Sequence, residues 1–190
     1  MPRWEPDARE RFVGSALHLF TEQGYDNTTV AEIAQRAGLT KSTFFRHFAD
    51  KREVLAAGQE TLSRLLAEGI ATAAADATPL GAVAVGLQNA AGAMTPFNRE
   101  LGPRLAAVIA TSAELREREA LKRVGMSEAM AEALRDRGVE EAQAIVAGEL
   151  GVLAFKESFS AWIAEGNERE LGGLAREALD RLRVAITQLG

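Results

Sequence analysis

Residues 29–48 read TVAEIAQRAGLTKSTFFRHF, a pattern that predicts two short helices joined by a tight turn. Thr29 and Glu32 have the spacing of a capping box, in which each side chain satisfies a free backbone amide at the start of a helix. Gly38 suits the left-handed turn that ends this helix, and Thr40 can cap a second helix that continues to about His47. This arrangement is a helix-turn-helix, whose second helix enters the major groove of DNA.

The second of these helices mixes polar and aromatic residues. Residues 40–47 carry hydroxyl, lysine, arginine and histidine side chains, while Phe44, Phe45 and Phe48 place three phenylalanines within five positions. Exposed together, three phenylalanines would form a costly apolar patch. We therefore expect Phe44 and Phe48 to pack in the core and the polar side of the helix to face DNA.

The remainder of the chain also reads as helical, because it is rich in Ala, Leu, Glu and Arg and has few β-branched runs. A first helix is expected over 7–22, and a long fourth helix from a capping box at Asp50 and Glu53 to about Ile70. Proline predicts helix boundaries at Thr78-Pro79, Thr95-Pro96 and Gly102-Pro103. Helices are expected at 79–93, 103–111 and 114–136, and then at 139–165 and 168–189. The fold class is all-α, with a helix-turn-helix DNA-binding domain over 1–52 and a larger helical domain over 53–190.

Charge is unevenly distributed along the chain. The net charge is −5, but residues 1–52 hold eight Lys/Arg against seven Asp/Glu, so the acidic excess lies after residue 52. Phosphate repels such an acidic region, and any contact with DNA must come from the N-terminal segment. The chain has no cysteine, no apolar signal segment and no run long enough to span a bilayer, so we expect a cytoplasmic protein without a membrane partner.

Motifs of enzyme chemistry are absent from the sequence. It contains no Gly-x-Ser-x-Gly elbow, no phosphate-cradling glycine loop and no His-Glu-x-x-His, and two separated histidines without cysteine argue against a metal site. We expect no enzyme activity, no cofactor and no metal. Two alternatives stay open: a helical module that binds a protein partner and not DNA, and an all-α enzyme that uses carboxylates in an apolar pocket.

The last two expected helices carry more apolar positions than one packed face requires. The economical partner for these surfaces is the same pair of helices in a second subunit, related by a two-fold axis. The positions expected in this homodimer interface are Ile145, Leu150, Val152, Phe159, Leu171, Leu174, Ala178, Leu182, Ala185 and Leu189.

The N-terminal residues resemble the TetR family of regulators. The resemblance covers about fifty residues and is carried by Ala16-Leu-His-Leu-Phe20, Gly24-Tyr-Asp-Asn-Thr-Thr-Val30, Ile33-Ala34, Ala37-Gly38-Leu39, Ser42-Thr-Phe-Phe-Arg-His-Phe48 and Asp50-Lys51. It implies a three-helix DNA-binding domain, a ligand-binding and dimerisation domain of six or so helices, and a dimer formed by the last two. It also implies a repressor of a pseudo-palindromic operator, released when a small molecule favours a state with wrongly spaced DNA-binding domains. The resemblance implies that movement of the fourth helix, which runs from Lys51 into the C-terminal domain, transmits this change to the DNA-binding domain.

The resemblance assigns DNA contacts by matching position. Lys41, Ser42 and Thr43 match positions that read or approach the bases of double-stranded operator DNA. His47 and Lys51 match positions that grip phosphate. Lysine can donate to guanine acceptors. The family most often has tyrosine where Phe45 stands, so Phe45 retains only a van der Waals contact. The expected DNA-binding residues are Thr29, Thr40, Lys41, Ser42, Thr43, Phe45, Arg46, His47 and Lys51.

A ligand pocket is expected in the C-terminal domain, for an unidentified small hydrophobic or amphipathic effector. Glycine and alanine are dense over 81–93, where truncated side chains would leave space between helices. Ordinary core packing is the competing interpretation for each apolar residue of this domain. The candidate lining residues are Leu66, Leu87, Met94, Phe97, Leu105, Ile109, Met126, Met130, Phe155, Phe159 and Trp162.

Overall fold

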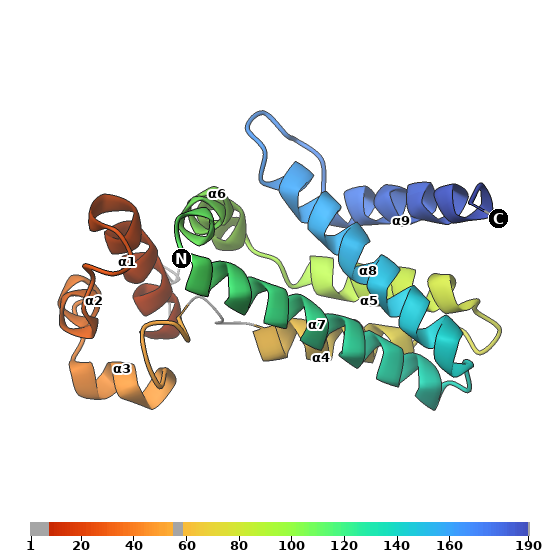
Figure 1. The fold of residues 1–190 in the computed structure, drawn as a ribbon, viewed down its shortest axis with the longest axis horizontal. Helices are drawn as coiled ribbons and strands as arrows, with labels where there is room; N and C mark the ends of the chain where they lie inside the picture. Colours follow the sequence, from red (N-terminus) through yellow and green to blue (C-terminus); the bar gives the residue numbers. More distant parts are fainter. Residues whose placement is uncertain (1–7, 55–58, 190) are drawn as a thin grey trace, which may run out of the picture. The chain divides into compact units, whose positions relative to one another are not determined.

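The computed structural model describes residues 8–54 and 59–189, and all regular secondary structure in these two ranges is α-helical (Figure 1). The predicted all-α fold class is confirmed. The chain divides into two compact units. The head unit comprises Met1–Ala57 with Glu100–Ala120, and the body unit comprises Gly58–Arg99 with Leu121–Gly190. The functional boundary expected near residue 52 stays a prediction, and the packing adds residues 100–120 to the unit that contains the helix-turn-helix.

Three helices build the N-terminal part of the head unit: α1 (Ala8–Gln23), α2 (Val30–Arg36) and α3 (Lys41–His47). Phe12 of α1 meets Phe44 and Phe48 edge-on, with ring centroids 5.2 Å and 6.2 Å away. All three rings are buried, so Phe44 and Phe48 are core residues as predicted. Edge-to-face aromatic pairs add to the stabilisation that burial alone supplies.

Local signals in the sequence fix where α2 and α3 begin. Thr29 and Glu32 form the predicted capping box, and the Thr40 side chain accepts a hydrogen bond from the Thr43 amide. Gly24 and Gly38 have φ of +86° and +66°, a backbone conformation that favours glycine and ends the preceding helix. The helix-turn-helix therefore folds as its sequence predicts.

The fourth helix differs from the prediction at its start. The Asp50 carboxylate accepts hydrogen bonds from the amides of Arg52 and Glu53, at 2.7 Å and 3.2 Å. The Glu53 carboxylate pairs with Arg118 and does not complete a capping box with Asp50. Residues 51–54 accordingly form a turn, and α4 extends over Gln59–Ala71. The expected helical residues 55–58 lie outside the described part of the chain.

Five more helices follow: α5 (Pro79–Gly92), α6 (Pro96–Thr111), α7 (Ala113–Asp136), α8 (Glu141–Trp162) and α9 (Leu171–Thr187). The predicted start of α6 at residue 103 is wrong, because Pro103 lies inside this helix. Thr95 and Asn98 cap each other, with the Thr95 amide 2.9 Å from Asn98 Oδ1, so the helix begins at Pro96. Proline suits this first position, where its missing N–H has no helical partner to lose.

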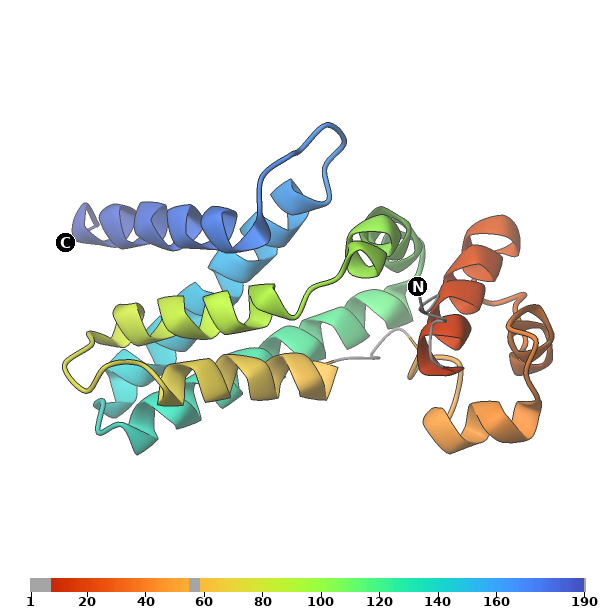
Figure 2. The same ribbon diagram turned by 180° about the vertical axis from the view of Figure 1, so that it is seen from behind.

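In the body unit, α4 and α5 lie side by side in both views of the ribbon (Figures 1 and 2). A Cβ atom added at Gly86 would lie 2.7 Å from the Leu66 carbonyl oxygen, and one added at Gly69 would lie 2.6 Å from Gly86 Cα. The small residues of α5 thus allow two backbones to touch, and the space expected around Gly86 is filled by α4. None of the described helices combines the length and the apolar character that crossing a membrane requires.

Candidate nucleic-acid interface

The outer side of α3 presents polar side chains above an aromatic core. Lys41, Ser42, Arg46 and His47 are exposed, whereas Phe44 on the inner side is completely buried. Phe45 also faces outward, with 56% of its surface exposed. Its exposed ring leaves Phe45 free for the van der Waals contact expected of it. The structure thus brings together six of the sequence-predicted DNA-binding residues on one short helix, five of them exposed and Thr43 half-buried.

The threonines near this surface are engaged within the protein. Thr40 Oγ1 accepts from the Thr43 amide at 3.1 Å and lies 2.9 Å from Thr43 Oγ1, which in turn accepts from Arg46. Thr29 Oγ1 donates to the Glu32 carboxylate at 2.7 Å. Hydrogen bonds from Thr29 hold the pKa of Glu32 below its ordinary value. These hydroxyl groups fix the starts of α2 and α3 and position the side chains next to them.

Lys51 reaches back to the turn between α1 and α2. Its ammonium nitrogen lies 2.7 Å from the Tyr25 carbonyl oxygen and 3.1 Å from that of Thr28, with Asp26 O at 3.4 Å. It also lies 4.3 Å from the centroid of the Tyr25 ring. Burial raises the pKa of Tyr25 to about 12, so this ring stays neutral at physiological pH. The sequence predicted Lys51 as a phosphate contact and gave no sign of these internal bonds.

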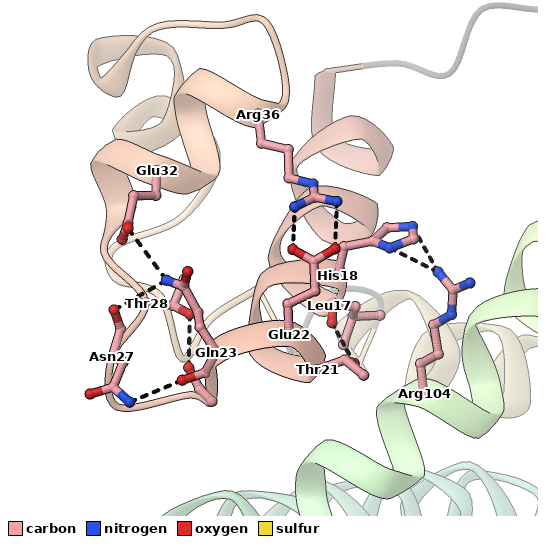
Figure 3. A network of polar contacts seen from close by, with 11 residues as sticks. Leu17, His18, Thr21, Glu22, Gln23, Asn27, Thr28, Glu32, Arg36 and Arg104 are labelled. Atoms are coloured by element: carbon pink, nitrogen blue, oxygen red, sulfur yellow. Dashed lines mark hydrogen bonds and ion pairs between the residues drawn. The ribbon is translucent and has the colours of Figure 1, made fainter.

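A polar network on α1 was not predicted from the sequence (Figure 3). Arg36 of α2 binds Glu22 through both of its terminal nitrogens. One turn away, Nη1 of Arg104 lies 2.7 Å from Nε2 and 3.1 Å from Nδ1 of His18. His18 and Glu22 are four positions apart in the sequence, which places both on one face of α1. No local signal could have identified Arg104, which lies 86 positions away.

Ion pairs join residues 100–120 to the rest of the head unit. Arg52 contacts Glu114 at 3.3 Å and also pairs with Asp50. Glu53 pairs with Arg118, as described above. Each pair is partly exposed, and such pairs contribute little individually to stability. Together they connect the turn at residues 50–54 with the start of α7.

Positions predicted for the dimer interface divide by burial. Four are buried within the subunit itself and offer no surface to a partner: Val152, Leu171, Leu174 and Ala178. These face the protomer's own core because α8 and α9 pack on each other and on α5. Three are half-buried: Leu150, Phe159 and Leu182. Three are exposed: Ile145, Ala185 and Leu189. The sequence missed four exposed apolar positions of the same two helices: Val146, Leu153, Val184 and Ile186.

Positions predicted to line a ligand pocket also divide. Five are buried: Leu66, Leu87, Met126, Met130 and Trp162. Six are half-buried: Met94, Phe97, Leu105, Ile109, Phe155 and Phe159. Phe155 stacks on Phe159 at 5.8 Å, Phe159 lies 5.7 Å from Trp162, and Met94 packs against this group. Leu105 and Ile109 belong to the head unit and the other nine to the body unit.

An open apolar groove lies elsewhere in the body unit, between the starts of α5 and α8 and the end of α9. Its volume is about 630 Å³, and the predicted dimer residue Leu150 lines it together with Val146 and Ile186. Arg183 is its only charged lining residue. None of the predicted pocket residues belongs to its lining.

Comparison with known proteins gives the head segment a family. Residues 13–57 match the family described as bacterial regulatory proteins, tetR family. TcmR of Streptomyces glaucescens, an HTH-type transcriptional regulator, is 50% identical to this chain over 46 residues. That segment is 24% of this chain and 20% of TcmR, so the chain spans about a fifth of this curated relative.

Solved structures share the fold over most of the chain. SmeT in complex with triclosan has a TM-score of 0.59 and 22% identity, covering 95% of this chain and 91% of its own. SmeT is described as the repressor of the Stenotrophomonas maltophilia multidrug efflux pump SmeDEF. FadR from Bacillus subtilis in complex with stearoyl-CoA has a TM-score of 0.56 and 18% identity, covering 90% of this chain and 96% of its own. The head segment thus matches the tetR family of bacterial regulatory proteins, and the chain as a whole shares the fold of these solved structures.

Proposed function

We propose that the protein is a transcriptional regulator that binds operator DNA through α3. The observation that carries this proposal is the outer side of α3, where Lys41, Ser42, Arg46 and His47 are exposed over the buried Phe44. Ammonium and hydroxyl groups can read base edges in the major groove, and guanidinium and imidazole groups can contact phosphate. A contact of this kind overcomes the net charge of −5 because it is local.

The regulator acts as a homodimer in this proposal. Exposed apolar side chains of α8 and α9, among them Val146 and Ile186, favour a two-fold contact between copies of this chain. The two α3 helices of such a dimer fit DNA half-sites about 34 Å apart, which is the length of one turn of the DNA helix. The corresponding operator is pseudo-palindromic.

A small hydrophobic or amphipathic effector releases the DNA. The half-buried Met94, Phe155 and Phe159 beside Trp162 support this proposal, because partly exposed apolar side chains can admit an apolar ligand. The structures of SmeT with triclosan and FadR with stearoyl-CoA provide two chemically different probes. An effector that binds the DNA-incompetent state more tightly lowers operator affinity, and the protein then acts as a ligand-responsive repressor.

Selection of duplexes from a random pool by the purified full-length protein tests the DNA-binding function. We expect recovery of a motif with two inverted half-sites, bound with a strong dependence on salt. A control with Lys41 and Arg46 both replaced by alanine should recover no motif. If the wild-type protein enriches no sequence, the alternative of a helical interaction module without DNA binding replaces the proposal.

Tryptophan fluorescence tests the effector region. Trp4→Phe leaves Trp162 as the only tryptophan, since the chain has two. We expect titration with triclosan or stearoyl-CoA to change the emission of Trp162 and to weaken operator binding in the same concentration range. A change in operator affinity without any change in Trp162 emission would place the effector elsewhere in the body unit.

A further inference from the structure

The ammonium group of Lys51 is bonded within the protein. A lysine ammonium has three N–H donors, and this one faces three backbone carbonyl oxygens at 2.7 Å, 3.1 Å and 3.4 Å, those of Tyr25, Thr28 and Asp26. The Tyr25 ring lies against it at 4.3 Å and adds a cation–π interaction. These hydrogen bonds are charge-assisted and therefore stronger than neutral ones.

The carbonyl groups that Lys51 binds belong to the turn between α1 and α2. Thr28 is buried, its hydroxyl donates to the Gly24 carbonyl oxygen at 2.8 Å, and its amide donates to the Tyr25 carbonyl oxygen at 3.2 Å. Thr29 follows directly and caps α2. At the other end of α2, the Leu39 amide donates a hydrogen bond to the Ala34 carbonyl oxygen. The chain then continues into α3. The position of this turn therefore sets the position of both helices of the helix-turn-helix.

We propose that Lys51 is a positioning residue, which holds the turn at residues 25–28 and through it the start of α2. The inference rests on the proposed function for its effect on DNA binding. Its structural part concerns the free protein and can be tested without DNA.

Amide hydrogen exchange of the free protein tests the structural part. Lys51→Met keeps most of the side-chain length and removes the ammonium, so the turn loses three hydrogen bonds. We expect the amides of Thr28 and Glu32 to exchange about tenfold faster or more, since hydrogen bonds to charged groups contribute on the order of 1.5–3 kcal/mol. Lys156→Met, at an exposed position of α8, is the matched control and should leave these amides unchanged. Unchanged exchange in Lys51→Met overturns the proposal.

Lys51→Arg separates positioning from phosphate contact, and it remains usable if Lys51→Met does not fold. Arginine binds phosphate well, but its planar fork cannot direct donors at three converging carbonyl groups as an ammonium can. We expect operator affinity to fall about tenfold, as the loss of one charge-assisted hydrogen bond implies. Wild-type affinity in Lys51→Arg overturns the proposal.

A scan with single methylphosphonate substitutions in the selected operator distinguishes positioning from a general loss of stability. In the wild-type protein, neutralising a phosphate that the protein contacts weakens binding. In Lys51→Arg, neutralising the phosphates near the start of α2 should no longer weaken binding, whereas neutralising those near α3 still should. An unchanged pattern contradicts positioning, because reduced stability lowers all affinities alike. If the wild-type protein binds no operator, the proposed function fails, and the exchange experiment still decides the role of Lys51.

Discussion

Lys41 and Ser42 occupy the first two positions of α3, directly after the capping residue Thr40. The Thr40 hydroxyl is held by Thr43, so it serves the helix and leaves its neighbours to meet a partner. Thr29 has the same role at the start of α2, where its hydroxyl group is bound to Glu32. At the scale of single residues, the side chains that shape the surface and those that can touch DNA are therefore different ones.

Replacing Lys41 by alanine should relax the sequence preference of the protein. A lysine that donates to a base acceptor contributes about 1–3 kcal/mol of discrimination at that position. Fluorescence anisotropy with the selected operator and its single-base variants measures this directly. Lys156→Ala, far along the chain on an exposed site of α8, is the control. Equal discrimination by Lys41→Ala and the wild-type protein would remove Lys41 from the base-reading set.

Sequence reasoning succeeded for residues whose partners are close in the chain. The capping partners Thr29 and Glu32 are three positions apart, so their hydrogen bonds follow from local geometry. The bonds of Lys51 span up to 26 positions and the contact between His18 and Arg104 spans 86. Such contacts depend on how helices pack, and no periodicity in one sequence predicts them.

The stability of the folded protein should depend on pH through the capping box at the start of α2. Hydrogen bonds from Thr29 lower the pKa of Glu32 below its ordinary value of 4.5, so the ionised carboxylate stabilises the folded state above that pH. This contribution is lost as the pH falls through the lowered folded-state pKa. Glu32→Gln keeps the length of the side chain and its hydrogen-bonding oxygen but removes the charge.

Urea denaturation of both proteins between pH 3 and pH 7 measures this effect. We expect the variant to be less stable than the wild-type protein at pH 7 and the difference to shrink below pH 4.5. Glu22 and Asp50, whose pKa values are also lowered, titrate in both proteins and cancel in the comparison. A stability difference that stays constant over this range contradicts the assignment to Glu32.

Two glycines of α5 should respond to alanine with opposite signs. A methyl group at Gly86 would collide with the Leu66 carbonyl oxygen on α4, and overpacking of this kind costs about 1–3 kcal/mol. Gly92, at the end of the same helix, has no atom within 4 Å of its added Cβ, so alanine there should stabilise by roughly 0.5 kcal/mol. Urea midpoints of the two variants provide the measurement, and equal shifts would show that α4 and α5 are not in close contact.

Helix boundaries were predictable where a capping residue and a proline mark the same helix start, and less so elsewhere. Pro79 at the first position of α5 follows the cap Thr78, and the prediction is confirmed. Pro103 was interpreted as another start, although a proline inside a helix is tolerated at the cost of one hydrogen bond. The nearby pair of Thr95 and Asn98 carried the correct signal for α6.

For the whole molecule, the exposed apolar face of α8 and α9 is the main test of assembly. Val146→Glu places a charge in the proposed two-fold interface, where the symmetry doubles its effect. We expect sedimentation to show subunit association weakened by roughly a hundredfold or more, together with weaker operator binding. Val124→Glu on α7 is a matched control, because the two valines are 51% and 52% exposed. Identical sedimentation of the two variants would contradict an interface at Val146.

The number of helices and the position of the helix-turn-helix could be read from periodicity and caps. The choice between core and interface could not, because both use the same apolar side chains at the same helical spacing. Ala178 and Ala185 both follow the stripe of α9, yet Ala178 is fully buried and Ala185 is exposed. That difference arises from the packing of α9 on α5 and α8, which involves residues distant in sequence.

The head unit is assembled from two separate stretches of chain, since residues 100–120 belong to it along with the N-terminal segment. Consider a hybrid regulator in which the first fifty-seven residues are fused to the sensor domain of another protein. It would lack Arg104, Glu114 and Arg118, which contact His18, Arg52 and Glu53 in this protein. Exchange of specificity between such proteins calls for three junctions, with residues 100–120, which are most of α6 and the start of α7, transplanted together with α3.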